Sequence, residues 1–147
     1  MSTVLFLDFD GVLHPVGGAA AGTRLSQLPL LADLLREPTM ADVQVVIAST
    51  WREMYPVTRL RKLFPADLQP RIVDATPVLD DYVTDHERYE EIRAWLDEHP
   101  ETLHWAALDD DREGFPPKAH RNAVFPDATI GATPTDIDAL RNLLAGG

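Results

Sequence analysis

Hydrophobic residues are distributed along this chain in two alternating patterns. Short apolar runs rich in Val, Ile, Leu and Phe are typical of buried strands, whereas apolar residues that recur every three or four positions predict amphipathic helices. The expected strands cover residues 4–7, 43–48, 71–75, 104–108 and 122–125, and the expected helices cover residues 25–36, 52–63, 85–96 and 135–144. Because strands and helices alternate, the pattern predicts an α/β fold, in which three Rossmann-like layers are built around a parallel five-stranded sheet with right-handed crossovers.

Two carboxylates follow the first expected strand. Asp8 and Asp10 come directly after the apolar run 4–7, and Gly11 allows the chain to turn away at once. Open α/β sheets bind ligands just outside the carboxyl ends of their strands, so Asp8 and Asp10 are expected where such a fold performs chemistry. The alternative interpretation is a solvated strand end without a function.

An acidic triplet, Asp109, Asp110 and Asp111, follows the fourth expected strand. Buried carboxylates this close together repel one another unless a cation is present. The triplet therefore predicts either a cation site or an exposed acidic loop.

The composition restricts the classes of partner. The net charge of −11, from 24 acids against 13 Lys and Arg, argues against broad nucleic-acid binding and against binding to anionic membranes, although a local basic pocket for one phosphate is compatible with it. The absence of cysteine excludes disulfides and thiolate metal sites. No apolar run approaches the about 18 residues of a membrane helix, and the first residues lack the basic start of a signal peptide. We expect a single domain over residues 1–147 with a cytoplasmic location.

The segment 8–13, which reads DFDGVL, resembles motif I of the haloacid dehalogenase (HAD) superfamily. In that motif the first Asp is a nucleophile and the second a general acid/base. In the phosphatases of the superfamily the first Asp is transiently phosphorylated. Mg2+ is held there by the side chain of the first Asp, by the backbone carbonyl of the second, and by an acid from a later strand. The resemblance therefore implies a HAD-like fold, catalytic roles for Asp8 and Asp10, and Mg2+ as the cofactor.

Ser49, at the end of the strand 43–48, resembles motif II, a Ser or Thr that hydrogen-bonds the transferring phosphoryl group. Thr50 is the alternative phosphate ligand, and either hydroxyl could instead cap the helix that follows. Trp51 and Arg52 are expected to shape the substrate pocket, with a core anchor as the alternative for Trp51.

Motif III of the superfamily is a cation, usually Lys, at the start of a helix, and Arg88 occupies that place here. This substitution is a departure from the pattern. Lys118, in the loop after the fourth strand, is the alternative source of a phosphate-binding cation. Arg88 would then be a surface ion-pair partner of Glu87 or Glu91.

The acidic triplet resembles motif IV in its Asp-Asp form. Alignment of that form makes Asp110 the metal ligand, together with Asp8 and Asp10, and places Asp109 beside it as a supporting residue.

Only about thirty residues separate Asp10 from the second strand, so a folded cap domain has no room and the site is expected to be open. An open site suits a bulky substrate, a phosphate that protrudes from a macromolecule, or a range of small phosphates. Small residues at 17–22 and acids at 80–82 are expected to lie in loops. The short layout resembles the small HAD-type domains of RNA-repair proteins.

The resemblance implies a Mg2+-dependent phosphatase that acts through an aspartyl-phosphate, on a phosphorylated substrate of unknown class. The alternative is a catalytically weak or inactive HAD-fold binding module, which the missing motif III lysine would favour. A response-regulator receiver domain is disfavoured, because it carries its phosphoacceptor on a middle strand.

Overall fold

The computed structural model describes residues 2–17, 24–79 and 86–146. Most of the loop expected at 17–22, and all of the acidic connection at 80–82, lie outside the described residues. Its strands are β1 (Ser2–Leu7), β2 (Val43–Ile47), β3 (Ile72–Ala75), β4 (Thr102–Leu108) and β5 (Ala123–Val124). Its α-helices are α1 (Leu28–Leu35), α2 (Val57–Arg61), α3 (Glu87–Asp97) and α4 (Pro134–Leu144). No helix in these ranges is both long and apolar enough to cross a membrane.

The strands form one five-stranded sheet in the order β3-β2-β1-β4-β5, and every pairing is parallel. This confirms the predicted Rossmann-like α/β class. The chain builds outward from β1 through β2 to β3 and then returns to the other side of β1 to add β4. The reversal places a topological switch point at the carboxyl ends of β1 and β4, where ligands bind in open α/β sheets.

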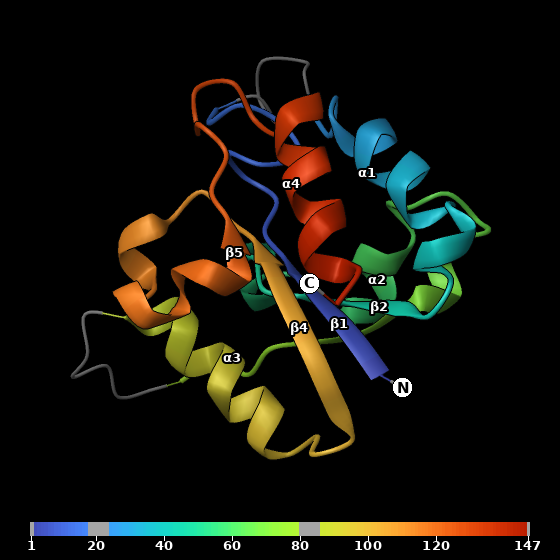
Figure 1. Cartoon of the computed structure of the whole chain (residues 1–147). Coiled ribbons are helices and arrows are strands. Elements are labelled where there is room, and N and C mark those ends of the chain that lie inside the picture. Colours follow the sequence, from blue (N-terminus) through green and yellow to red (C-terminus); the bar gives the residue numbers. More distant parts are fainter. Residues whose placement is uncertain (1, 18–23, 80–85, 147) are drawn as a thin grey trace.

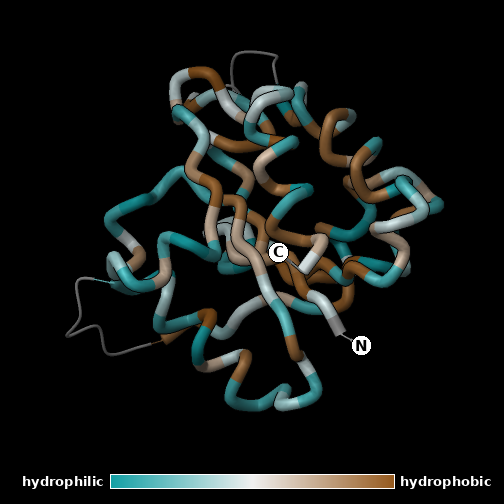
Figure 2. Tube along the Cα trace, in the orientation of Figure 1, coloured by the Kyte–Doolittle hydropathy of each residue, from teal (hydrophilic) through white to brown (hydrophobic). Residues whose placement is uncertain are grey.

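Helices cover both faces of the sheet (Figure 1), because alternate side chains of β1 point to opposite sides. Leu5 and Leu7 pack with α1, α2 and α4 in one hydrophobic cluster, while Val4 and Phe6 pack with α3 in another. Hydrophobic segments gather along the central strands, whereas the outer turns are mainly hydrophilic (Figure 2).

The prediction of one helix over 52–63 was wrong. Residues Thr50–Glu53 form a short 3-10 helix, and α2 begins only at Val57. Pro56 lies between them as the N-cap of α2, a position that suits a residue without a backbone N–H. The apolar spacing of this segment therefore indicated correctly that it packs on the core, but it did not indicate one continuous helix.

Smaller differences affect the other connections. The loop after the fourth strand, which carries Lys118, contains 3-10 turns at Arg112–Gly114 and Pro117–Asn122. Two more such turns lie at Pro38–Met40 and Gln69–Arg71. Between β1 and β2 the described residues form only α1 and the turn at Pro38–Met40, which agrees with a minimal cap.

Candidate active site

Three carboxylates converge at the carboxyl ends of β1 and β4. Oxygens of Asp8, Asp109 and Asp110 lie within 4.8 Å of one another, with Asp8 and Asp109 buried and Asp110 partly exposed. The sheet explains their proximity, because Leu7 is paired with Leu108 and the next residue of each strand is an acid. The sheet order thus brings Asp110 to Asp8.

Gly11 allows Asp110 to approach the turn after β1. Its φ of +77° is rarely adopted by other residues, and a Cβ atom there would lie 2.4 Å from Asp110 Oδ2. The glycine is therefore required both for the turn and for the space that the Asp110 carboxylate occupies.

The acid cluster has an excess of negative charge. Burial raises the pKa of Asp8 well above its usual value, the neighbouring Asp109 raises it further, and the Arg88 guanidinium lowers it. Burial likewise raises the pKa of Asp109 to about 6, against the opposing effect of Arg88. A divalent cation would relieve this repulsion, and a set of carboxylate oxygens is the type of donor that Mg2+ prefers.

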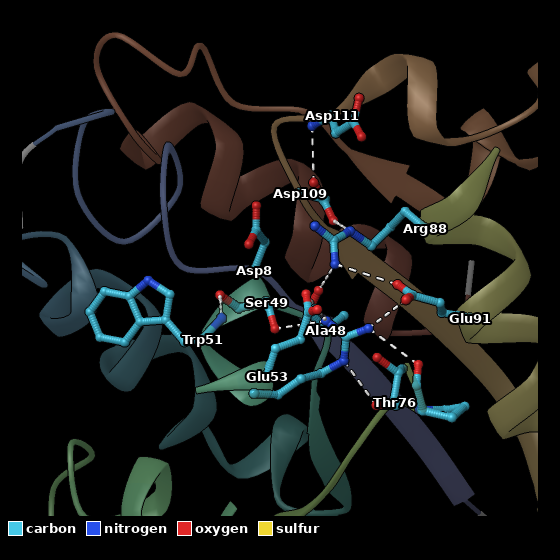
Figure 3. Close-up of polar contacts among 12 residues, drawn as sticks. Asp8, Ala48, Ser49, Trp51, Glu53, Thr76, Arg88, Glu91, Asp109 and Asp111 are labelled. Atoms are coloured by element: carbon cyan, nitrogen blue, oxygen red, sulfur yellow. Dashed lines mark hydrogen bonds and ion pairs between the residues drawn. The ribbon is translucent and has the colours of Figure 1, made fainter. Parts of the chain in front are cut away.

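The acids of the cluster differ in how many of their oxygens already have hydrogen-bond or ion-pair partners. Asp109 Oδ1 accepts a hydrogen bond from the Asp111 N–H at 2.9 Å, and its Oδ2 lies 2.9 Å from Arg88 Nε (Figure 3). Asp8 Oδ1 accepts from the Phe9 N–H at 2.8 Å. Asp8 and Asp110 therefore retain more lone pairs for a metal ion than Asp109 does.

Arg88 reaches the cluster from the first turn of α3 (Figure 3). Its Nη1 donates to the Ala48 carbonyl, and Glu91 lies 3.8 Å away on the same helix. The Nε contact with Asp109 is an ion pair without hydrogen-bond alignment, since Nε has no hydrogen-bond partner among the described residues. The guanidinium is thus positioned beside Asp8 and Asp109 by contacts with β2, β4 and its own helix.

Lys118, the alternative cation, lies elsewhere. It is exposed, and its ammonium is 5.7 Å from the centre of the Tyr89 ring. It forms no ion pair with an acid of the cluster in the described part of the chain.

Ser49 lies at the end of β2, next to β1, and is fully buried. Its Oγ accepts a hydrogen bond from the Trp51 N–H at 3.2 Å and so caps the turn Thr50–Glu53, which makes the capping alternative correct for Ser49. The Ser49 hydroxyl can still donate its own proton. Thr50 is exposed and lines a cavity of about 280 Å³ together with Arg88.

Arg52 connects three parts of the fold. Its Nε donates to the Thr76 carbonyl at 2.9 Å, its Nη1 to the Ser49 carbonyl at 2.9 Å, and its Nη2 pairs with Glu91 at 2.5 Å. Because the guanidinium is buried and already has acceptors on several nitrogens, it holds α3 against the ends of β2 and β3. Arg52 thus supports the site indirectly, by fixing Glu91, which also lies near Arg88.

The Asp10 carboxylate is oriented by two residues outside the acid cluster. His14 Nδ1 accepts from the Leu25 N–H at 3.1 Å, so His14 Nε2 carries the proton that is shared with Asp10 Oδ1 at 2.7 Å. The Trp51 indole donates to Asp10 Oδ2 at 2.9 Å. Trp51 is also a core anchor, with its ring edge-on to Phe9.

His14 was not recognised from the sequence as a site residue. The available signal was its spacing of four residues from Asp10 in the turn after β1. Asp10 itself remains accessible, since its side chain is 46% exposed. It can therefore meet a substrate while its orientation is fixed.

Another cavity, of about 620 Å³, lies at the opposite end of the sheet. It is lined by Val43 and Leu103, near the starts of β2 and β4. The acid cluster is at the other end of these strands, so we do not associate this cavity with the site.

Comparison with known proteins identifies one matching family. No curated protein and no solved structure matches the chain significantly. The profile of one protein family, described as the HAD domain in Swiss Army Knife RNA repair proteins, matches residues 4–137. This range includes every residue of the acid cluster. A HAD domain suggests a phosphatase-type function. The chain therefore belongs to the HAD superfamily, in the family of HAD domains found in Swiss Army Knife RNA repair proteins.

Proposed function

We propose that this protein is a Mg2+-dependent phosphatase that hydrolyses phosphoric monoesters through an aspartyl-phosphate on Asp8. The convergence of Asp8, Asp109 and Asp110 at the switch point of the sheet, with Arg88 beside them, supports this most directly. Asp8, the Asp10 carbonyl and Asp110 would hold the metal ion. Bound Mg2+ supplies positive charge that offsets the repulsion between Asp8 and the phosphate.

Each polar residue of the site has a role in this reaction. A carboxylate oxygen of Asp8 attacks phosphorus, and the bond between phosphorus and the ester oxygen breaks. Asp10 gives a proton to the departing oxygen and later takes one from the water that hydrolyses the aspartyl-phosphate, roles that generally contribute about 10²–10⁴-fold in rate. Ser49 and Arg88 bind the non-bridging oxygens, over which charge is spread in the transition state.

The proposal extends to the kind of substrate. Between Asp8 and α1 the chain has too few residues for a cap domain, so nothing of that size would enclose the phosphate. A phosphate that protrudes from a larger molecule is compatible with such a site.

Substitution of the proposed nucleophile tests this function. Asp8→Asn should abolish Mg2+-dependent hydrolysis of p-nitrophenyl phosphate, because an amide cannot attack phosphorus, while the folded structure is retained. Asp10→Asn should slow both formation and hydrolysis of the aspartyl-phosphate. Asp42→Asn, an exposed acid at the opposite end of β2, is the matched control. Near wild-type turnover by repurified Asp8→Asn protein would exclude the covalent mechanism.

The same assay separates the enzyme from a binding module that has the HAD fold but no activity. A binding module would show no Mg2+-dependent turnover in the wild-type protein. Chelation of the metal would then change nothing in the assay.

A further inference from the structure

A cleft lies beside Asp10. Its cavity of about 320 Å³ is lined by Asp10, Arg24, Trp51, Met54 and Tyr55. A smaller cavity of about 100 Å³ shares Arg24, Trp51 and Tyr55 and adds Arg59. The shared residues make these two hollows one continuous surface, which we call the Asp10 cleft.

Aromatic rings and arginines alternate in the Asp10 cleft. The guanidinium carbon of Arg24 lies 5.2 Å from the centre of the Trp51 ring, and that of Arg59 lies 4.7 Å from the centre of the Tyr55 ring. The rings hold both arginines by cation–π contacts, which leave the N–H groups of the guanidinium edge available to an anion.

The acids in the described part of the chain leave the charge of these arginines without an ion-pair partner. Neither Arg24 nor Arg59 forms an ion pair with an acid among the described residues, whereas Arg36 and Arg141 on the outer helices do. The chain carries 24 acids against 13 Lys and Arg, so the two unpaired arginines form a local positive patch on an acidic molecule. Such a patch attracts anionic ligands.

The position of Asp10 indicates which part of a substrate would enter the cleft. In the proposed function the phosphate lies at Asp8, Ser49 and Arg88, and Asp10 protonates the departing oxygen. The group attached to that oxygen must therefore lie on the Asp10 side. Asp10 lines the cleft, and its carboxylate is held by Trp51, which is part of the cleft wall.

On this basis, and resting on the proposed function, we propose that the Asp10 cleft is the leaving-group subsite and that it binds a nucleotide. The base would pack against the exposed Met54 side chain and the cleft-facing edges of Trp51 and Tyr55, whose ring faces contact the arginines. A further phosphate of the nucleotide would pair with Arg24 and Arg59.

A nucleotide fits the chemistry of the cleft better than other phosphorylated groups. Aromatic side chains stack on bases of any sequence, and arginine binds phosphate oxygens in a planar fork. A sugar phosphate offers no aromatic ring to stack on the aromatic wall, and a phosphotyrosine side chain offers no second anion for the arginines. A cavity of about 320 Å³ is at the lower end of the roughly 300–1,000 Å³ of small-molecule sites, which suits one nucleotide. The net charge of −11 disfavours binding of a longer nucleic-acid strand along the protein surface.

Binding can be measured without turnover. Adenosine 3′,5′-bisphosphate and ribose 5-phosphate are titrated by calorimetry, with Mg2+, into the inactive Asp8→Asn protein. The bisphosphate should bind about tenfold more tightly or better, because it supplies both the base and a second phosphate. Equal affinities would overturn the proposal. A 3′-phosphorylated trinucleotide shows whether the nucleotide in the subsite belongs to a nucleic-acid end or is free. If the trinucleotide binds more tightly than the bisphosphate, the natural ligand is a nucleic-acid end. If it binds more weakly, the natural ligand is a free nucleotide.

Variants of the cleft provide the second test. Arg24→Gln and Arg59→Gln remove exposed side chains, so the fold should persist. Each should lower the ratio of kcat/KM for adenosine 3′,5′-bisphosphate to that for p-nitrophenyl phosphate by roughly tenfold. Arg121→Gln, an exposed arginine on the far side of β4, should leave this ratio unchanged.

The possible failures are distinguishable. An unchanged ratio in both cleft variants, or a preference for a phosphotyrosine peptide over the bisphosphate, would overturn the nucleotide subsite while leaving the phosphatase intact. Absence of turnover with every substrate, including p-nitrophenyl phosphate, would instead reject the proposed function.

Discussion

Asp8 must be ionised to act as a nucleophile, yet its surroundings oppose ionisation. Burial and the neighbouring Asp109 raise the pKa of Asp8, and Arg88 is the side chain that lowers it. Arg88 would therefore have two functions, since the same guanidinium keeps Asp8 charged and faces the phosphate. An arginine suits both, because it stays protonated at any physiological pH.

This leads to a prediction for the cation of the site. Arg88→Ala should lower kcat/KM on the order of 10²-fold, the usual cost of removing one preorganised donor to a transition state. Arg88→Lys should recover part of the loss, because it restores the charge but not the planar fork. Lys118→Ala is the control and should leave kcat/KM near the wild-type value.

Folding must be verified for these proteins, because loss of Arg88 leaves Asp109 buried without its ion pair. Circular dichroism at the assay temperature provides that check. The opposite ranking of the Arg88 and Lys118 variants would transfer the phosphate-binding role to Lys118.

At the scale of single elements, the ends of helices and strands position the site. The loop before α4 packs on the turn after β1, where the Ala132 N–H donates to the Val12 carbonyl at 2.7 Å. The helix itself begins with a capping box, in which the Thr133 hydroxyl accepts from the Asp136 N–H and the Asp136 carboxylate accepts from the Thr133 N–H. The start of α4 is thus fixed next to the turn that carries Asp10.

Removal of this cap should be measurable. Thr133→Ala is expected to lower the free energy of unfolding by about 1 kcal/mol, because the Asp136 backbone N–H at the helix start loses its partner, the Thr133 hydroxyl. Thr135→Ala, an exposed substitution of the same type in the first turn of α4, is the matched control and should change stability by less. Urea denaturation of the three proteins compares them. A larger loss in Thr135→Ala than in Thr133→Ala would contradict the assignment of the cap.

At the scale of the whole molecule, the acid cluster couples metal binding to the stability of the folded state. Three carboxylates meet at one edge of a sheet within a chain of net charge −11, and Arg88 compensates only part of their repulsion. An ion that binds only the folded state stabilises it by RT ln(1 + [L]/Kd). Divalent cations should therefore stabilise the protein as well as support turnover.

We predict that Mg2+ raises the melting temperature, with a stabilisation of about 2.7 kcal/mol at one hundred times Kd. Asp110→Asn should remove most of this response, because it deletes a charge from the cluster. Asp111→Asn is the control, since Asp111 is exposed and its carboxylate accepts from the Gly114 N–H instead. Differential scanning calorimetry with and without Mg2+ measures the shift. An equal response in the Asp110→Asn protein would show that the ion binds at another place.

Local patterns in the sequence determined the elements and the order of the motifs. Apolar runs located all five strands. The run in the central β1 is continuous because a strand buried on both faces needs consecutive hydrophobic residues, whereas the edge strands β3 and β5 are only partly buried. Acids directly after such runs, at Asp8 and Asp109, could be assigned to strand ends on the same basis. The break at Pro56 is also visible in the sequence, because proline lacks the backbone N–H that a helix interior needs.

Only the tertiary structure decided which side chains meet. The contact of Asp8 with Asp110 depends on β4 lying next to β1, and the contact of Arg88 with Asp109 joins α3 to β4. The structure also assigned Arg52 to support Glu91, and brought Trp51 to Asp10 across 41 positions of the chain. The type of a side chain determines its chemistry, and its spacing from other residues indicates its motif. Its partner, however, depends on which helices and strands pack together, and this packing depends on burial of hydrophobic residues over the whole chain. The sequence therefore specified the reactive groups, and the packing of the sheet and helices specified the site that they form.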